Sequence, residues 1–120
     1  MKITVGTDII EIARIKSSIF ENEKFLERVY TENEINYCEQ RKEQKYQSYA
    51  VRFAAKEAIY KALSNYIKDY SWKDFEILND SKGRPYVKIG FYIENLENIE
   101  ISLSHCKEYA VAYATAVFKE

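Results

Sequence analysis

The amino-acid sequence predicts an α+β fold in which an antiparallel sheet packs against one long central helix. Three observations predict it: a strand pattern at the N-terminus, one long helical pattern in the middle, and strand patterns gathered in the C-terminal half. A strand followed by helices and then by an antiparallel set of strands is typical of the α+β class. The 120 residues fit a single domain over residues 1–120.

The N-terminal segment, residues 2–10, alternates as a strand does. One side of the predicted strand carries Ile3, Val5, Thr7 and Ile9, and the other carries Thr4, Gly6, Asp8 and Ile10. Asp8 therefore interrupts an otherwise apolar segment.

Three short helices are predicted next, over residues 11–20, 22–29 and 31–41. Thr31 followed by Glu34 forms the capping-box pattern that starts the third of them. The longest helical pattern covers residues 43–66 and is apolar on two sides, so we expect a central and mostly buried helix. Glu57 falls on the second apolar stripe, between Phe53 and Tyr60.

The remaining patterns predict strands over residues 75–78, 85–89, 99–103 and 109–118. Turn-forming residues 79–83 join the first two as a hairpin. One face of the last strand consists of Ala110, Ala112, Ala114 and Ala116. Such small side chains allow another element to pack very close.

Composition narrows the function classes. The net charge of -1 gives no overall field that would favour nucleic acid or a membrane surface. Cys38 and Cys106 form no CxxC pair, so we expect reduced thiols and a cytoplasmic protein. The N-terminus does not have the pattern of a signal peptide, and no apolar run approaches transmembrane length.

Two carboxylates stand at unusual, apolar positions. Taken alone, Asp8 is best explained as the cap of the next helix, and Glu57 as the partner of Lys61 in a helical pair worth about 0.2–0.5 kcal/mol. Taken together, they fit a divalent metal site better than either does singly. Two carboxylates completed by substrate phosphates and water are the usual way to hold Mg²⁺.

Arg52, Lys56 and Lys61 place three cations around Glu57 on the same helix. Each could be an ordinary solvated residue, but together they could meet a polyanion such as a phosphate chain. His105 is the only histidine and lies at a predicted strand end. A single histidine is more often structural, although a strand end leaves it free to face a cleft.

Four segments, taken together, resemble the holo-(acyl-carrier-protein) synthase family of phosphopantetheinyl transferases. They read VGTDIIEIARI at 5–15, RFAAKEAIYKAL at 52–63, GRPY at 83–86 and SLSHCKEYA at 102–110. The likeness covers the whole chain. It implies the 4'-phosphopantetheinyl transferase fold and a role in fatty acid biosynthesis. The implied reaction moves 4'-phosphopantetheine from coenzyme A to a serine of an apo acyl carrier protein and releases adenosine 3',5'-bisphosphate.

The resemblance also implies roles for individual residues. Mg²⁺ would be held by Asp8 and Glu57, with Lys61 beside the phosphates. Whether Glu57 itself or a water on the metal accepts the serine proton stays open. The residues that would line the coenzyme A site are Arg52, Lys56, Pro85 and His105.

The implied partner surface faces the acidic carrier protein and consists of Arg14, Lys24, Phe25 and Arg28. The family is trimeric, with active sites between neighbouring subunits. The small size of the chain and its alanine face also favour a homotrimer.

Three departures from the family pattern stand out. Ser64 and Asn65 replace a Gly-rich turn that contributes adenine contacts, and Glu21 stands where relatives often carry a basic residue. The segment between Ile89 and Ile99 is shorter than in many relatives, which would curtail a helix there.

Two alternatives remain. The same chemistry could serve another carrier, such as a peptide or polyketide synthase domain, although relatives of that kind are often twice this length. A non-catalytic carrier-binding module would require Asp8 or Glu57 to be dispensable.

Overall fold

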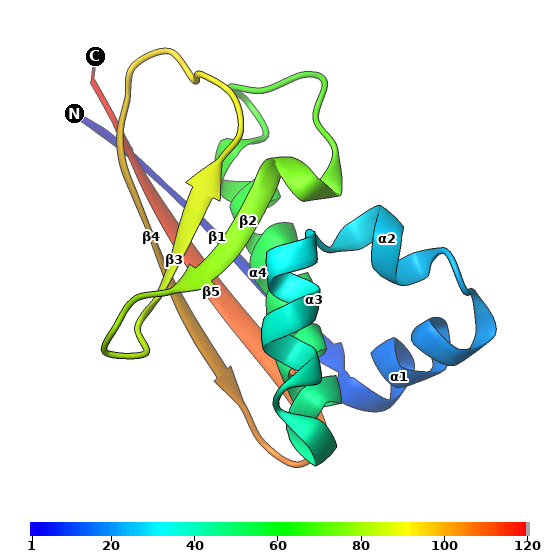
Figure 1. Ribbon diagram of the computed structural model, residues 1–120. Helices are drawn as coiled ribbons and strands as arrows, with labels where there is room; N and C mark the ends of the chain where they lie inside the picture. Colours follow the sequence, from blue (N-terminus) through cyan, green and yellow to red (C-terminus); the bar gives the residue numbers. More distant parts are fainter. Residues whose placement is uncertain (120) are drawn as a thin grey trace.

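The computed structural model of the protein describes residues 1–119 and has the expected α+β architecture. Figure 1 shows the long helix α4 lying across one face of three long strands, with the shorter helices to one side. The elements are β1 (Lys2–Glu11), α1 (Ile12–Glu21), α2 (Phe25–Val29), α3 (Glu32–Glu39), η1 (Lys42–Gln44), α4 (Lys45–Leu63), η2 (Trp72–Asp74), β2 (Phe75–Asn79), β3 (Pro85–Ile89), β4 (Leu96–His105) and β5 (Tyr109–Phe118).

The strands form two antiparallel sheets. The larger has the order β1-β5-β4, and the smaller is the β2-β3 hairpin. The hairpin turns where the sequence predicts, and Gly83 has a φ of 86° that favours glycine. The hairpin lies beside α4, so strands and helix share one apolar core.

The alanine face of β5 packs against α4. Ala110, Ala112, Ala114 and Ala116 are all buried. Opposite Ala114 in β1 stands Gly6, where a Cβ atom would lie 2.0 Å from the carbonyl oxygen of Ala58. The predicted close approach is therefore confirmed, and its partner is the helix. The part of the trimer expectation that relied on the alanine face is wrong, because α4 already covers that face.

The opposite face of the same sheet is uncovered in the single chain. Ile3, Val5 and Ile9 are 55%, 54% and 66% exposed, and Tyr109 and Tyr113 on β5 are also exposed. The period-two alternation predicted for β1 is thus present, with its apolar side turned outward. A contiguous apolar sheet face of this kind is typical of a protein contact.

The helical segments follow the sequence with small shifts at their ends. The capping box at Thr31 and Glu34 is present, and α3 begins immediately after it. The second helix begins at Phe25, because the amide of Phe25 bonds to the carbonyl of Asn22 in a turn. Residues 90–95 contain no helix, in line with the curtailment expected there. No helix within residues 1–119 is long and apolar enough to cross a membrane.

Candidate active site

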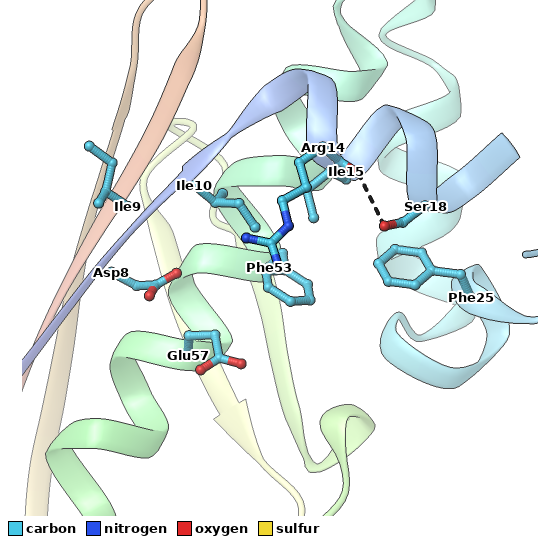
Figure 2. A pocket seen from close by; sticks show the side chains of 9 residues that line it. All are labelled: Asp8, Ile9, Ile10, Arg14, Ile15, Ser18, Phe25, Phe53 and Glu57. Carbon is cyan, nitrogen blue, oxygen red and sulfur yellow. Dashed lines mark hydrogen bonds between the residues drawn. The ribbon is translucent and has the colours of Figure 1, made fainter. Parts of the chain in front are cut away.

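Asp8 and Glu57 line one cavity of about 310 Å³. The two carboxylates come from elements far apart in sequence, the C-terminal part of β1 and the middle of α4. They are brought together because Gly6 lets β1 lie directly on α4. Figure 2 shows both side chains at the same open space. The other lining residues are Ile9, Ile10, Arg14, Ile15, Ser18, Phe25 and Phe53.

Lys61 adjoins this pair. Its ammonium donates to Oδ1 of Asp8 at 3.2 Å and to the carbonyl oxygen of Thr7 at 2.9 Å. The Lys61 side chain is 49% exposed, whereas that of Asp8 is only 18% exposed. The lysine can therefore leave Asp8 without crossing the protein interior, and it can reach an anion bound at the cavity mouth.

The carboxyl of Glu57 has a raised pKa. Its partial burial is the main cause, and the negative charge of Asp8 adds to it, while Lys61 acts in the opposite direction. A carboxyl whose ionisation is opposed by burial and by a neighbouring carboxylate favours a cation beside it.

The donor set fits Mg²⁺. Mg²⁺ usually takes one or two carboxylates and completes its shell with waters and substrate phosphates. Asp8 and Glu57 supply two carboxylates, and residues 1–119 contain no group of three or more His, Cys, Asp or Glu side chains placed to hold a metal ion. The cavity is therefore suited to a metal that shares its coordination with the substrate, and less to a metal held by protein alone.

A second cavity, of about 260 Å³, brings together Arg52, Pro85 and His105. Arg52 is 3% exposed, and its guanidinium lies 4.3 Å from the centre of the Tyr37 ring. It also donates to the side chain of Asn79. Its Nε atom has no hydrogen-bond partner among the described residues. A guanidinium that keeps its charge and lines a cavity can bind an anion there.

Lys56 lies elsewhere. The resemblance implies a place in the coenzyme A site, but its side chain is fully buried and its ammonium forms an ion pair with Glu34 at 2.8 Å. Neither of the two cavities described above is lined by it. In this structure Lys56 cannot meet a ligand without breaking that pair.

The structure places two of the four residues expected to face the carrier in the lining of the carboxylate cavity. Arg14 and Phe25 line it, and Lys24 and Arg28 are exposed on or next to α2. Figure 2 shows the Arg14 side chain extending from α1 toward Phe53. Arg14 and Phe25 thus share a cavity with the two carboxylates, whereas Lys24 and Arg28 are placed only on the neighbouring surface.

Two of the cavity-lining residues that the sequence analysis does not assign to the site are Phe53 and Arg41. Phe53 forms the aromatic wall of the carboxylate cavity, where its ring is stacked with Phe25 at 6.2 Å. The sequence contains one indication of this role: Phe53 lies about one helical turn before Glu57 on the same apolar stripe. Arg41 joins Arg52 in the second cavity, and the sequence gives no pattern that distinguishes it from a solvated arginine.

The two cavities lie on different flanks of α4 and have no lining residue in common among those described. Arg52 and Glu57 are five positions apart, which places them about 140° apart around the helix. One chain therefore presents a carboxylate cavity and an arginine cavity separately.

Comparison with known families gives one match over most of the chain. Residues 4–114 match the family model of the 4'-phosphopantetheinyl transferase superfamily. A holo-[acyl-carrier-protein] synthase of Ruminiclostridium cellulolyticum is 54% identical over 123 aligned positions, which cover 95% of this chain and 91% of that protein. The synthase of Protochlamydia amoebophila is 46% identical, with 95% and 97% of the two chains covered.

Solved structures are similar as well. A holo-(acyl-carrier-protein) synthase from Bacillus anthracis in complex with CoA (3',5'-ADP) superposes with a TM-score of 0.80 and 37% identity, covering 94% of both chains. An ACPS-CoA complex from Chronobacterium ammoniagenes gives a TM-score of 0.88 at 25% identity and covers both chains completely.

Proposed function

Because this chain belongs to the 4'-phosphopantetheinyl transferase superfamily, we propose that the carboxylate cavity and the arginine cavity are the two halves of one transferase site. The enzyme transfers the 4'-phosphopantetheine group of coenzyme A to a serine of apo acyl carrier protein, giving holo carrier and adenosine 3',5'-bisphosphate. We propose one transferase domain over residues 1–120. The observation that carries the division of roles is that Asp8 and Glu57 line one cavity, with Lys61 paired to Asp8, whereas Arg52 and His105 line another.

Asp8 and Glu57 would hold Mg²⁺, which when bound neutralises charge on the pyrophosphate oxygens of coenzyme A. The serine oxygen of the carrier forms a bond to the β-phosphorus, and the bond from that phosphorus to the bridging oxygen breaks. Glu57, in its ionised form, accepts the serine proton. The bridging oxygen leaves with the electron pair on adenosine 3',5'-bisphosphate.

Lys61 would meet that leaving charge. Its ammonium moves from Asp8 to the phosphate oxygens, a motion that its exposed side chain allows. Positioning and charge stabilisation supply most of the acceleration in phosphoryl transfer of this kind. Lys61 is therefore placed in the catalytic machinery together with Glu57.

Arg52, Pro85 and His105 would hold the adenosine bisphosphate end of coenzyme A. Arg52 carries a permanent charge and lines a cavity that His105 also lines. A rigid guanidinium suits phosphate oxygens because it presents several donors in one plane. Lys56 is left out of this set, since Glu34 already neutralises it.

A homotrimer would unite the two halves. A chain that exposes Ile3, Val5 and Ile9 on one sheet face needs a partner there. The carboxylate cavity of one subunit could then meet the arginine cavity of the next in a closed ring. Sedimentation should give about three times the chain mass of 14.2 kDa, and an active monomer would contradict the shared site.

The carrier would approach from α1 and α2. Arg14, Lys24 and Arg28 offer positive charge to an acidic carrier, and Phe25 offers an apolar anchor at the cavity mouth. A cytoplasmic location is proposed with this role. Its support is that Cys38 and Cys106 are both free thiols, and Cys106 is exposed.

One assay tests the function directly. The protein is incubated with apo acyl carrier protein, coenzyme A and Mg²⁺, and the mass of the carrier is measured by mass spectrometry. The expected result is the added mass of one phosphopantetheine group, absent when the carrier serine is replaced by alanine. A carrier that remains unmodified, with folded protein and intact substrates, would refute the function.

A further inference from the structure

A fully buried ion pair between Glu34 and Lys56 is not used in the reaction. The ammonium of Lys56 lies 2.8 Å from Oε1 of Glu34, and both side chains are 0% exposed. Burying two charges is costly, and apolar residues of similar volume often give equal or greater stability. Stability alone is therefore a weak explanation for this pair, and its hydrogen bonds indicate what it holds in place.

From its place on α4, Lys56 binds two backbone carbonyl groups of other elements. Besides Glu34, its ammonium donates to the carbonyl oxygen of Val29 at 2.8 Å and to that of Trp72 at 3.0 Å. Val29 is the last residue of α2, and Trp72 is the first residue of η2. All three donors of the ammonium are thus used, and each reaches a different element.

The carboxylate of Glu34 accepts hydrogen bonds from two further backbone amides. Its Oε1 atom also accepts from the amide of Thr31 at 2.8 Å, which is half of the capping box of α3. Its Oε2 atom accepts from the amide of Ile77 in β2 at 2.8 Å. The carboxylate therefore ties α3 and the hairpin to the same lysine.

The elements fixed by Lys56 build the aromatic wall of the carboxylate cavity. The Trp72 ring is stacked with Phe53 at 4.9 Å, and Phe53 is stacked in turn with Phe25 of α2. Phe53 and Phe25 line that cavity together with Glu57, which is the next residue after Lys56. A shift of α2 or η2 would therefore move the wall relative to the catalytic carboxylate.

We infer that Glu34 and Lys56 are a positioning pair that sets the place of α2 and Trp72 against α4, and so the width of the cavity into which the carrier serine enters. The inference rests on the proposed approach of the carrier over α1 and α2. It predicts that the pair serves carrier recognition and leaves coenzyme A binding alone. The resemblance to the family implies the reverse for Lys56.

The test uses Lys56→Met and Glu34→Gln in the full-length protein. Lys56→Met keeps the length of the side chain and removes all three donors, and Glu34→Gln keeps one acceptor and removes the charge. We expect the KM for apo carrier to rise about tenfold, since small displacements of positioning groups cost about this much or more. The KM for coenzyme A should stay close to its wild-type value.

Fluorescence gives a second readout. Trp72 is the only tryptophan, so intrinsic emission reports on this wall directly. Its emission should shift to longer wavelength in both variants, because the ring gains water when it leaves Phe53. A purely stabilising pair would leave both the KM and the emission of the folded protein unchanged.

Lys45→Met is the matched control. Lys45 also joins α4 to a glutamate of α3, Glu39, at 3.1 Å, but this pair is solvent-accessible. The control should retain both Michaelis constants and the emission wavelength. The change would then be due to the buried pair, and not to any lysine of this helix.

Folded variants with unchanged KM for carrier and unchanged Trp72 emission would overturn the inference. So would a rise in the KM for coenzyme A alone. If Lys56→Met does not fold, Lys56→Arg keeps the charge but adds bulk, and it should give the same selective rise. If none of these variants folds, the pair is a folding element only, and the inference is wrong. An inactive wild type would instead refute the proposed function.

Discussion

The carboxylate cavity and the arginine cavity beside α4 differ in charge and in how far their cations are buried. The carboxylate cavity is lined by Asp8 and Glu57, and the half-exposed Lys61 is paired with Asp8. The arginine cavity holds Arg52, which is buried and braced by Tyr37 and Asn79 before any ligand arrives. The charge of the arginine cavity is thus held by buried contacts, whereas the cation beside the carboxylate cavity is exposed to solvent.

The difference also bears on assembly. A substrate with phosphates at both ends of its nucleotide part needs both halves at once. The two halves lie on different flanks of one helix, so a single chain does not bring them together. A second copy of the chain can, if the exposed face of β1 and β5 is the contact between copies.

The largest expected effect is at the carboxylate cavity. Asp8→Ala should lower kcat/KM by roughly a thousandfold, because it removes charge stabilisation at the reacting phosphate. The fold should survive, since Asp8 is partly exposed and its removal leaves no buried unpaired charge. Steady-state assays with circular dichroism check both points. Glu11→Ala, at the exposed end of the same strand, is the control, and near-normal activity of Asp8→Ala in millimolar Mg²⁺ would disprove the assignment.

Gly6→Ala should lower the stability of the protein and displace Asp8, because it moves the backbone of β1. The new methyl would meet the carbonyl oxygen of Ala58, so β1 must move away from α4 and take Asp8 with it. Overpacking of this kind costs about 1–3 kcal/mol or more, which corresponds to a Tm lower by roughly 5–15 °C. Calorimetry measures the loss. Gly90→Ala is the control, because a methyl there meets nothing closer than 3.4 Å; equal melting temperatures would contradict the close approach.

Arg14→Glu should act on the carrier and spare coenzyme A. Arg14 lines the carboxylate cavity from α1, far in sequence from Arg52 and His105. We expect the KM for apo carrier to rise about tenfold, and added salt should bring the wild type toward the variant as steering is screened. Glu21 should make this salt effect smaller than in more basic relatives. A change in coenzyme A binding with carrier recognition intact would show that the two surfaces are assigned the wrong way round.

The smallest expected effect is a change in the melting temperature of the metal-free protein when Glu57 is replaced. The pKa of Glu57 is raised in the folded protein above its ordinary value of 4.5, so the native state holds the proton more readily than the unfolded state. Stability from this group is therefore present below pH 4.5 and is lost as the pH rises through the raised folded value. Glu57→Gln should remove that loss and melt slightly higher at neutral pH in EDTA. A lower Tm for the variant, measured by calorimetry across this pH range, would argue that burial and the charge of Asp8 do not raise this pKa.

Short-range sequence patterns are sufficient to predict most of the helices and strands. The alternation in β1, the capping box at Thr31 and the hairpin turn at Gly83 are short-range patterns, and each element lies where its pattern indicates. Strand alternation defines two faces, but it cannot say which one a helix will cover. The alanine face was therefore assigned in part to a subunit contact, although α4 packs on it.

The candidate site was less accessible to sequence reasoning. Asp8 and Glu57 were paired because both interrupt apolar patterns, and that signal is local. Lys56 carries no such signal, since its partners are the carbonyls of Val29 and Trp72 and the carboxylate of Glu34, all brought near by tertiary packing. Spacing along α4 could not distinguish this buried lysine from the exposed Lys61.

Mixing two inactive variants tests the shared site most directly. Asp8→Ala and Arg52→Ala are each purified, combined in equal amounts, and allowed to exchange subunits after mild denaturation. Where Asp8 of one chain meets Arg52 of another, both halves are intact, and random assembly gives such a site at about a quarter of the interfaces. The account predicts recovery of about that fraction of wild-type transfer activity. Activity no greater than the sum of the two variants alone, in trimers shown to have exchanged subunits, would contradict it.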